Sequence, residues 1–467
     1  MLDFITLPFI GEITLSGSIL AVFFLCILAC IAFEFVNGFH DTANAVATVI
    51  YTKALKPQIA VPWSGFFNFL GVYTGGVAVA MGILKLVPLN EMMALPVSVG
   101  ACLVLAVLVA SIIWNLGTWY LGIPCSSSHT MIGAMIGAGL GFTYFYSGNV
   151  NWSKASEIGL SLLMSPLFGF GAAVLLMWLL KHVIKAKSLF HVPQGENDRP
   201  PLLIRLLLIT TCTLVSFFHG SNDGQKGVGL LMLIFIAFLP MNFALNHAIS
   251  NDKILEALNN VEQSVTKIIA VNANQPDALS LDSAITKAKT ELATATGSSV
   301  TFSLRKHIQE VSKGAAALAE NKTLNIDASD KTALLADNKE LTKVTDYAPT
   351  WVIAIISISL GIGTMIGWKR IVVTIGEKIG KEHLNYAQGA TAEIVAAATI
   401  GLSTGFGLPV STTHVLSSGI AGAMVASNGA KNLNNGTLKN IALAWLLTLP
   451  VSIILSLLLF LFFHLFV

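Results

Sequence analysis

Two short stretches of the chain place a proline ahead of hydroxyl side chains and a histidine. "IPCSSSHT" starts at Ile123, and "LPVSTTH" starts at Leu408. Proline fits the first turn of a helix, and a Ser or Thr near it can cap the helix start. The free backbone N–H groups of such an end carry partial positive charge and bind anions. Two such ends that face each other would hold one small oxyanion, so the pattern predicts an anion site.

A second repeated pattern carries aspartate. The stretches "NGFHDTANAV" and "HGSNDGQKGV" contain Asp41 and Asp223, each three residues after a glycine and before an apolar segment. Asp41 with Asn44, and Asp223 with Asn222, offer hard oxygen ligands near expected helix breaks. A carboxylate inside a membrane span is costly and marks a functional site. A small cation or a proton held there would compensate the charge of an anion, which is what a symporter requires.

The composition is that of a membrane protein. Of 467 residues, 54% are hydrophobic and 11% are charged, whereas soluble chains have about 25% charged residues. Apolar stretches reach the roughly 20 residues of helix that cross a bilayer. We predict an all-α polytopic membrane protein with about ten to twelve membrane segments, several too short to cross alone. The net charge is +2 and basic runs are absent, so nucleic acid is not a partner.

The two motifs divide the chain into halves. Each half carries the Asp motif first and the Pro motif later. Interrupted helices at matching positions of a repeat are typical of secondary transporters with a site at the membrane midplane. We assign residues 1–180 to the first half, and residues 202–249 and 347–467 to the second.

Two polar segments interrupt the apolar pattern. Residues 181–201 are basic overall, so the positive-inside rule predicts a cytoplasmic linker. Residues 250–346 form a polar insert with helical pieces, in which acidic residues slightly outnumber basic ones. The helix that follows ends at Lys369 and Arg370, which should lie inside. We therefore predict that the insert is a small helical domain on the external, periplasmic side.

Four stretches together resemble a known family. "GFHDTANAVATVIYTKA", "PCSSSHT", "HGSNDGQKG" and "PVSTTH" occur here in the order found in the PiT family of inorganic phosphate transporters, in its bacterial low-affinity branch. The resemblance implies two inverted repeats with re-entrant hairpins, a homodimer among inner-membrane lipids, and phosphate import driven by protons or sodium. In bacterial members the cargo is often a neutral complex of a divalent metal with phosphate. We expect no cofactor and no fixed metal site.

The resemblance also implies roles for particular residues. The phosphate site would be lined by Ser126, Ser127, Ser128, Ser411, Thr412 and Thr413. The region that couples transport to protons or cations would contain Asp41, Asn44, Asn222 and Asp223. Glu393 matches a carboxylate that the family uses in transport.

The chain departs from the family's Gly-Ala-Asn-Asp-x-x-Asn-Ala pattern at two places, and differs from many sodium-coupled relatives at a third. His40 precedes the first Asp, and Lys226 stands where the second copy should have its later Asn. Asn68 stands where many sodium-coupled relatives carry Glu. Our hypothesis is that Lys226 supplies a fixed positive charge in place of one bound cation, and that His40 titrates near neutrality. Both favour coupling to protons over coupling to sodium.

Other readings of these residues remain open. Sodium could be the coupling ion, and sulfate, or a divalent metal alone, could be the cargo. Asp41 and Asp223 could instead form an intramembrane aspartyl protease dyad, but that leaves both Pro motifs unexplained. Lys226 could snorkel to a headgroup, and His129 and His414 could simply be packed. Glu34 lies near a helix end where it could reach the interface, so it is left out of the site.

Overall fold

The fold is described here from a computed structural model. The described residues are 2–7, 9–194, 198–271, 276–294, 298–321, 324 and 326–467. Residues 195–197 of the predicted linker lie outside them. The chain forms two compact units: the smaller contains residues up to Leu15, Leu89–Val97 and Phe235–Ala348, and the larger contains Ser16–Pro88, Ser98–Ile234 and Pro349–Val467.

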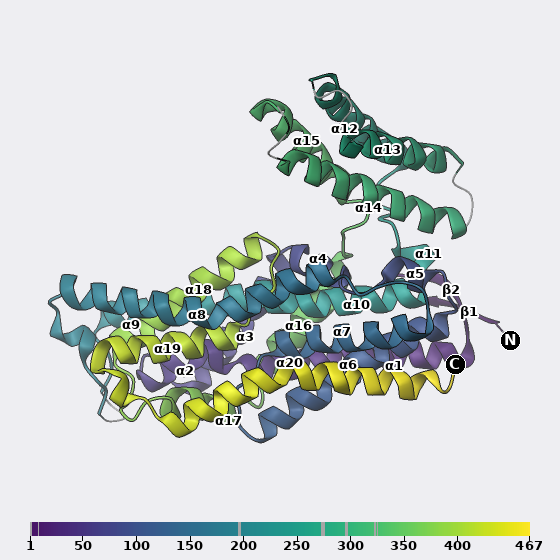
Figure 1. The fold of residues 1–467 in the computed structure, drawn as a ribbon. Coiled ribbons are helices and arrows are strands. Elements are labelled where there is room, and N and C mark those ends of the chain that lie inside the picture. The colour runs from purple at the N-terminus through teal and green to yellow at the C-terminus, as the bar shows by residue number, and fades with distance from the viewer. Residues whose placement is uncertain are drawn as a thin grey trace. The chain divides into compact units, whose positions relative to one another are not determined.

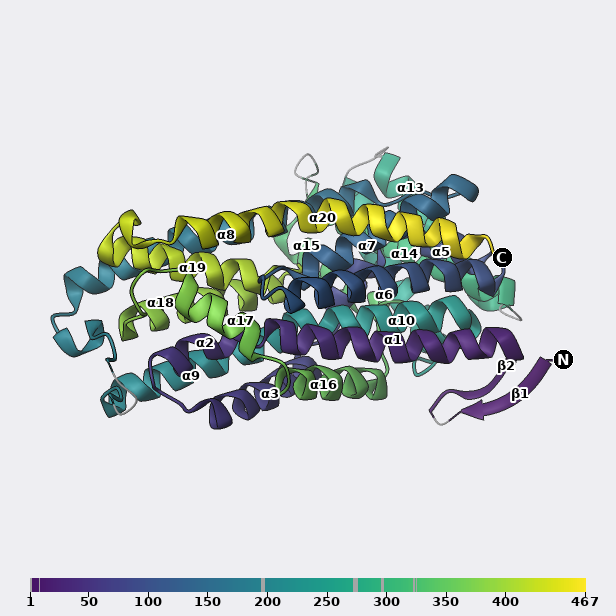
Figure 2. The ribbon, with the colours of Figure 1, turned by 90° about the horizontal axis from the view of Figure 1, so that it is seen from below.

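The larger unit is a bundle of apolar helices (Figures 1 and 2). Its first half contains α1 (Gly17–Asp41), α2 (Ala43–Tyr51), α3 (Pro57–Thr74), α4 (Ala78–Leu84), α6 (Val97–Tyr120), α7 (Ser127–Phe145), α8 (Trp152–Val183) and the short η1 (Lys187–Phe190). Its second half contains α9 (Leu202–His219), the π-helix η2 (Gly220–Gly224), α10 (Gln225–Phe238), α16 (Thr350–Thr364), α17 (Lys369–Val373), η3 (Thr374–Lys378), α18 (Tyr386–Gly405), α19 (Thr412–Asn428), η4 (Ala430–Asn432) and α20 (Asn435–His464).

The lengths of these helices confirm a polytopic membrane fold. Among the described residues, five helical stretches are long and apolar enough to cross a membrane: Gly17–Tyr51, Val97–Tyr120, Trp152–Val183, Leu202–Phe238 and Asn435–His464. Two further pairs of helices are long and apolar enough when each pair is counted as one span. They are α3 with α4, bent by 70°, and α16 with α17–η3, bent by 57°. The hairpin of β1 (Leu2–Leu7) and β2 (Gly11–Ser16) was not predicted from the sequence.

The order of elements recurs between the halves. Each half has a helix interrupted at the Asp motif, a bent pair, a helix that starts at the Pro motif, and a long last helix with an internal proline, Pro166 or Pro450. The packing crosses between the halves, because α7 lies along α20, α19 along α8, α16 along α1 and α3 along α9. Each half therefore depends on the other to cover its apolar faces. That the repeats are inverted remains a prediction.

Glycines on α7 permit its close contact with α20. A Cβ atom on Gly137 would lie 2.1 Å from the backbone oxygen of Ile453, and a backbone oxygen cannot move away as a side chain can. We expect Gly137→Ala to lower the melting temperature by several degrees, since the helices would have to separate. Gly159→Ala on α8 is the matched control, because nothing lies within 4 Å of its added Cβ. Equal melting temperatures for the two variants would contradict this packing.

The smaller unit contains the predicted insert, which is a four-helix bundle. Its helices are α12 (Asn251–Val271), α13 (Pro276–Thr294), α14 (Ser298–Glu320) and α15 (Ala328–Thr342), and each packs against two of the others. Short helices α5 (Leu89–Met93) and α11 (Pro240–Phe243) belong to the same unit. Apolar residues of all four long helices, such as Leu258, Ile285 and Ile308, form a core of its own. The side of the membrane on which the insert lies remains a prediction.

Hydrogen bonds join the segments that enter and leave this bundle. The buried Arg305 donates to the backbone oxygens of Ala244 and Thr345. Tyr347 donates to the backbone oxygen of Leu245 at 2.9 Å. Burial raises the pKa of Tyr347 to about 12, so the hydroxyl keeps its proton at neutral pH and remains a donor. These bonds hold the base of the bundle together.

Candidate functional site

The starts of α7 and α19 have the same local structure. The Ser126 side chain accepts a hydrogen bond from the His129 N–H at 3.3 Å, and the Ser411 side chain accepts one from the His414 N–H at 3.2 Å. Both serines are therefore N-caps, as the Pro motifs predicted. Their side-chain oxygens serve the helix starts, and among the described residues no hydrogen bond joins them to the two aspartates.

The two helix starts meet in the interior of the larger unit. Ser128 donates to the backbone oxygen of Val410 at 2.8 Å, and the rings of His129 and His414 lie 4.6 Å apart. From this point α7 and α19 extend to opposite sides in both views (Figures 1 and 2). The positive ends of the two helices therefore share one buried region. This is the facing arrangement that the duplicated motif predicted.

Asp41 lies at this meeting point and accepts hydrogen bonds from both motifs. Its Oδ2 accepts from Ser127 at 2.9 Å, and its Oδ1 accepts from Thr413 at 2.7 Å. Asn44 donates to the same Oδ1 at 3.2 Å and to the Thr413 hydroxyl at 2.9 Å. Asp41 is 1% exposed. The carboxylate thus bridges the starts of α7 and α19.

Asp223, from the second half of the chain, approaches the same hydroxyl cluster and shares Ser127 with Asp41. Its Oδ2 lies 2.8 Å from the Lys226 ammonium, 3.4 Å from the Thr412 hydroxyl and 3.5 Å from the Ser127 hydroxyl. Lys226 also donates to Ser128. The other oxygen of Asp223, Oδ1, is buried without a hydrogen-bond partner among the described residues. One cation and two carboxylates therefore surround the hydroxyl cluster.

Histidines complete the charged cluster. His219 Nε2 lies 3.8 Å from Asp41 and 3.6 Å from Asp223, while its Nδ1 lies 2.8 Å from the Asn68 side-chain oxygen. His40 Nδ1 lies 3.5 Å from Asp41 Oδ1. Ligand atoms of Asp41, His219 and Asp223 lie within 4.8 Å of one another, so this trio could hold a metal ion. The same groups could equally hold protons.

Helix breaks bring the two aspartates to this place. α1 ends at Asp41, and the following Thr42 donates to the backbone oxygens of Gly38 and Thr364, at 2.7 Å and 2.9 Å. Asp223 lies in the π-helix η2, a local widening that is frequent at functional sites. Gly220 starts that π-helix, and a Cβ there would lie 2.2 Å from the backbone oxygen of Asn68. Close approach of α3 therefore requires glycine.

Two predicted site residues lie beside the cluster. Asn222 donates to the backbone oxygen of Leu408 at 3.1 Å and accepts from the Val410 N–H at 3.2 Å, so it holds the segment before α19. Glu393 accepts from Thr48 on α2 and Thr211 on α9. Because Thr48 lies one turn beyond Asn44, Glu393 is next to the cluster and not in it.

Two readings from the sequence are wrong. Lys226 does not snorkel, because it is 0% exposed and paired with Asp223. Glu34 does not reach an interface: it is also 0% exposed and accepts from Asn37 at 3.2 Å. Its position seven residues before Asp41 places both carboxylates on one helix face, a signal that the sequence contained.

His219 was missed for a related reason. It lies four residues before Asp223, and such residues share a face of a helix. His219 opens the second Asp motif, but it was not among the predicted site residues. Two ring contacts to aspartates, with Asn68 orienting the ring, make it a member of the site.

Comparisons with known proteins identify the family of the chain. Residues 37–456 match the phosphate transporter family, PHO4. The chain is 40% identical to the low-affinity inorganic phosphate transporter of Buchnera aphidicola subsp. Acyrthosiphon pisum (strain APS), over 93% of this chain and 94% of that protein. It is 39% identical to the low-affinity inorganic phosphate transporter PitA of Escherichia coli (strain K12), over 91% of this chain and 93% of that one.

A solved structure shares the fold. It is described as "The sodium-dependent phosphate transporter", with a TM-score of 0.57 and 21% identity, covering 96% of this chain and all of the other. The family model and the relatives confirm the predicted resemblance, and a bacterial inner membrane location agrees with the relatives. The chain belongs to the phosphate transporter family, the PiT transporters, and is an integral membrane protein and not an enzyme.

Proposed function

We propose that this chain imports inorganic phosphate as a secondary active symporter coupled to protons, and binds the anion between the starts of α7 and α19 at the membrane midplane. The observation that carries the proposal is the convergence of Ser127, Thr412 and Thr413 on Asp41 and Asp223. Hydroxyls on two positive helix ends can donate to phosphate without adding a formal charge. The name of the family and of the relatives supplies the cargo.

The acceptors around the hydroxyls favour phosphate over sulfate. Protonated phosphate still carries O–H groups at neutral pH, whereas sulfate has none to donate. Asp223 Oδ1 and Asn44 Oδ1 are buried acceptors without a partner among the described residues. An anion that donates would satisfy them, and an anion that only accepts would leave them unpaired.

The charges at the cluster favour protons as the coupling ion. Lys226 already compensates Asp223, so a sodium ion at that carboxylate would meet a like charge at short range. With both histidines neutral, the two aspartates and one lysine leave one net negative charge. Protons on His219 and His40 would offset that charge and the charge of the anion.

A divalent metal can accompany phosphate within the same proposal. Asp41 and His219 offer an oxygen and a nitrogen ligand to a metal that arrives bound to the anion and travels with it as cargo, whereas Asp223 is already paired with Lys226. The pairing of Lys226 with Asp223 argues against a resident metal. A homodimer follows from the resemblance and stays a proposal.

Uptake of labelled phosphate into proteoliposomes tests the proposal. A pH gradient and a sodium gradient are imposed separately, with and without Mg²⁺. Uptake driven by the pH gradient alone supports proton coupling. Sodium-driven uptake at constant pH keeps the cargo and overturns the role given to Lys226 and His40. Absence of uptake under either gradient overturns the proposed cargo.

Removal of two hydroxyls tests the site itself. We expect Ser127→Ala with Thr412→Ala to reduce uptake about 100-fold or more, because two hydrogen bonds to charged groups are lost and each contributes about 1.5–3 kcal/mol. Thr143→Ala with Ser156→Ala is the matched control, since these hydroxyls donate to carbonyls of their own helices. Equal uptake by both double variants would contradict a role for the motif hydroxyls.

A further inference from the structure

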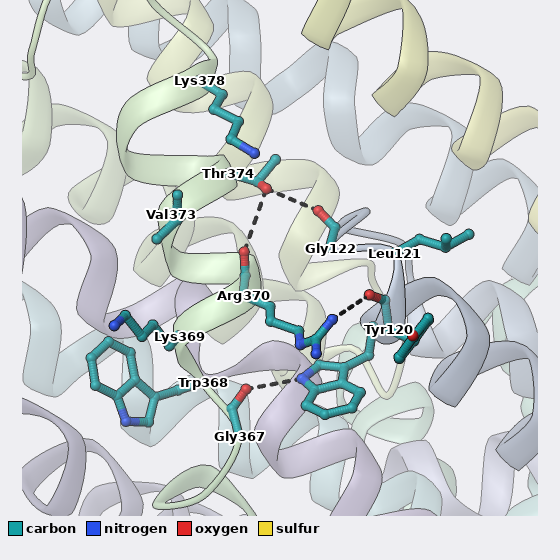
Figure 3. Close-up of a pocket in the computed structure, with 11 residues that line it drawn as sticks. Tyr120, Leu121, Gly122, Gly367, Trp368, Lys369, Arg370, Val373, Thr374 and Lys378 are labelled. Carbon is teal, nitrogen blue, oxygen red and sulfur yellow. Dashed lines mark hydrogen bonds between the residues drawn. The ribbon is translucent and has the colours of Figure 1, made fainter.

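A cationic and aromatic pocket lies away from the transport site. It has a volume of about 690 Å³ and lies between the end of α6 and the segment from α16 to η3 (Figure 3). Its lining consists of Trp119, Tyr120, Leu121, Gly122, Gly367, Trp368, Lys369, Arg370, Val373, Thr374 and Lys378. Three of these described lining residues are cationic and none is acidic, so the pocket favours an anion.

Arg370 is held in place at the centre of the pocket. Its guanidinium lies 5.1 Å from the ring centroid of Trp119 and 5.0 Å from that of Tyr120, and it donates to the backbone oxygen of Tyr120 at 2.7 Å. Thr374 donates to the backbone oxygen of Gly122 at 2.9 Å. In Figure 3, Arg370 and Lys378 both extend toward the Tyr120–Gly122 loop. A guanidinium fixed in this way keeps N–H groups for a phosphate.

The pocket lies at the end of the bundle that is expected to face the cytoplasm. The Tyr386 N–H donates to the backbone oxygen of His191 at 3.4 Å, which brings the basic linker to the segment after η3. Lys369, Arg370 and Lys378 add to the same basic end. The positive-inside rule places such an end in the cytoplasm, where anionic lipids attract basic residues near the membrane surface.

Apolar side chains continue from the pocket along the outside of the bundle. Tyr120 and Leu121 are 67% and 69% exposed at its rim, and Ile362 on α16 and Ile366 just after α16 are 48% and 50% exposed. Acyl chains can pack on such an apolar surface, whereas a free phosphate ion cannot. Aromatic side chains beside cations are also typical of the membrane interface.

We propose that this pocket binds the phosphate of an anionic phospholipid, with Arg370 and Lys378 on the headgroup and the acyl chains along α6 and α16. The inference goes beyond the transport proposal and does not depend on it. The Trp119 ring lies 5.0 Å from that of Phe39, the residue before His40. A bound headgroup would therefore stabilise the position of Trp119, which packs against Phe39 near the end of α1.

Native mass spectrometry of the full chain in detergent tests the proposal. Phosphatidylglycerol and phosphatidylcholine are titrated separately, each with and without excess inorganic phosphate. We expect tighter binding of phosphatidylglycerol, and binding at least tenfold weaker in Lys369→Gln with Lys378→Gln. Arg370→Gln is the second variant, with a melting curve to confirm folding. Lys431→Gln with Lys439→Gln is the charge-matched control outside the pocket and should bind as the wild type.

Each alternative result overturns the proposal. Displacement of the lipid by inorganic phosphate would assign the pocket to free phosphate. If lipid binding weakens equally in the pocket variants and the control variant, the weakening is due to general surface charge and not to this pocket. A photoactivatable phosphatidylglycerol should crosslink to residues 116–121 and 365–378, and crosslinks only elsewhere would place the lipid at another site.

Discussion

Asp41→Asn is expected to reduce phosphate uptake at least about 100-fold while the chain still folds. Asp41 accepts from Ser127, Thr413 and Asn44 through two oxygens. An amide has one oxygen, so at least one donor loses its acceptor and faces an NH₂ group. Each hydrogen bond to a charged group contributes about 1.5–3 kcal/mol. One bond is lost and the remaining donors no longer face a charge, so a total of about 3 kcal/mol gives a factor of about 100 or more.

Initial uptake rates in proteoliposomes, at equal protein content, measure this effect. Asp252→Asn, an exposed aspartate in α12, is the control with the same change of side chain and should transport like the wild type. The melting temperature of Asp41→Asn should stay within a few degrees of the wild type, because the shape of the side chain is kept. Wild-type uptake by Asp41→Asn would remove Asp41 from the mechanism.

Local patterns predicted much of the site because its parts obey local rules. A proline followed by serine predicted both helix starts, and Ser126 and Ser411 are the caps. The recurrence of both motifs placed them in matched elements of the two halves. Asp41 and Asp223 were predicted because a carboxylate in an apolar membrane segment is energetically costly and therefore indicates a function.

The missing parts depend on contacts between distant segments. The sequence does not say that Ser128 reaches Val410, or that Asn68 meets His219, since these pairs are far apart along the chain. Glu34 was misjudged because its burial depends on packing against Gly227, which is far away along the chain. The hairpin at the N-terminus was missed because its apolar residues lead directly into α1.

Lys226→Met is expected to lose uptake and to lower the melting temperature by several degrees. The Lys226 ammonium lies 2.8 Å from Asp223 and is 0% exposed. Removing one member of a buried ion pair leaves the other charge without compensation, which costs about 3–5 kcal/mol. Thermal unfolding in detergent and uptake in proteoliposomes measure the two effects. Lys439→Met, on the exposed side of α20, is the control and should change neither.

A second substitution separates the role of Lys226 in stability from its role in transport. In Lys226→Met with Asp223→Asn the uncompensated carboxylate is gone, so the melting temperature should recover most of the loss. Uptake should not recover, because both groups belong to the cluster that surrounds the hydroxyls. Recovery of stability without transport would show that the pair is needed for phosphate and not only for folding. Uptake restored in the double variant would instead mean that Lys226 serves only to neutralise Asp223, and its role in place of a coupling cation would have to be abandoned.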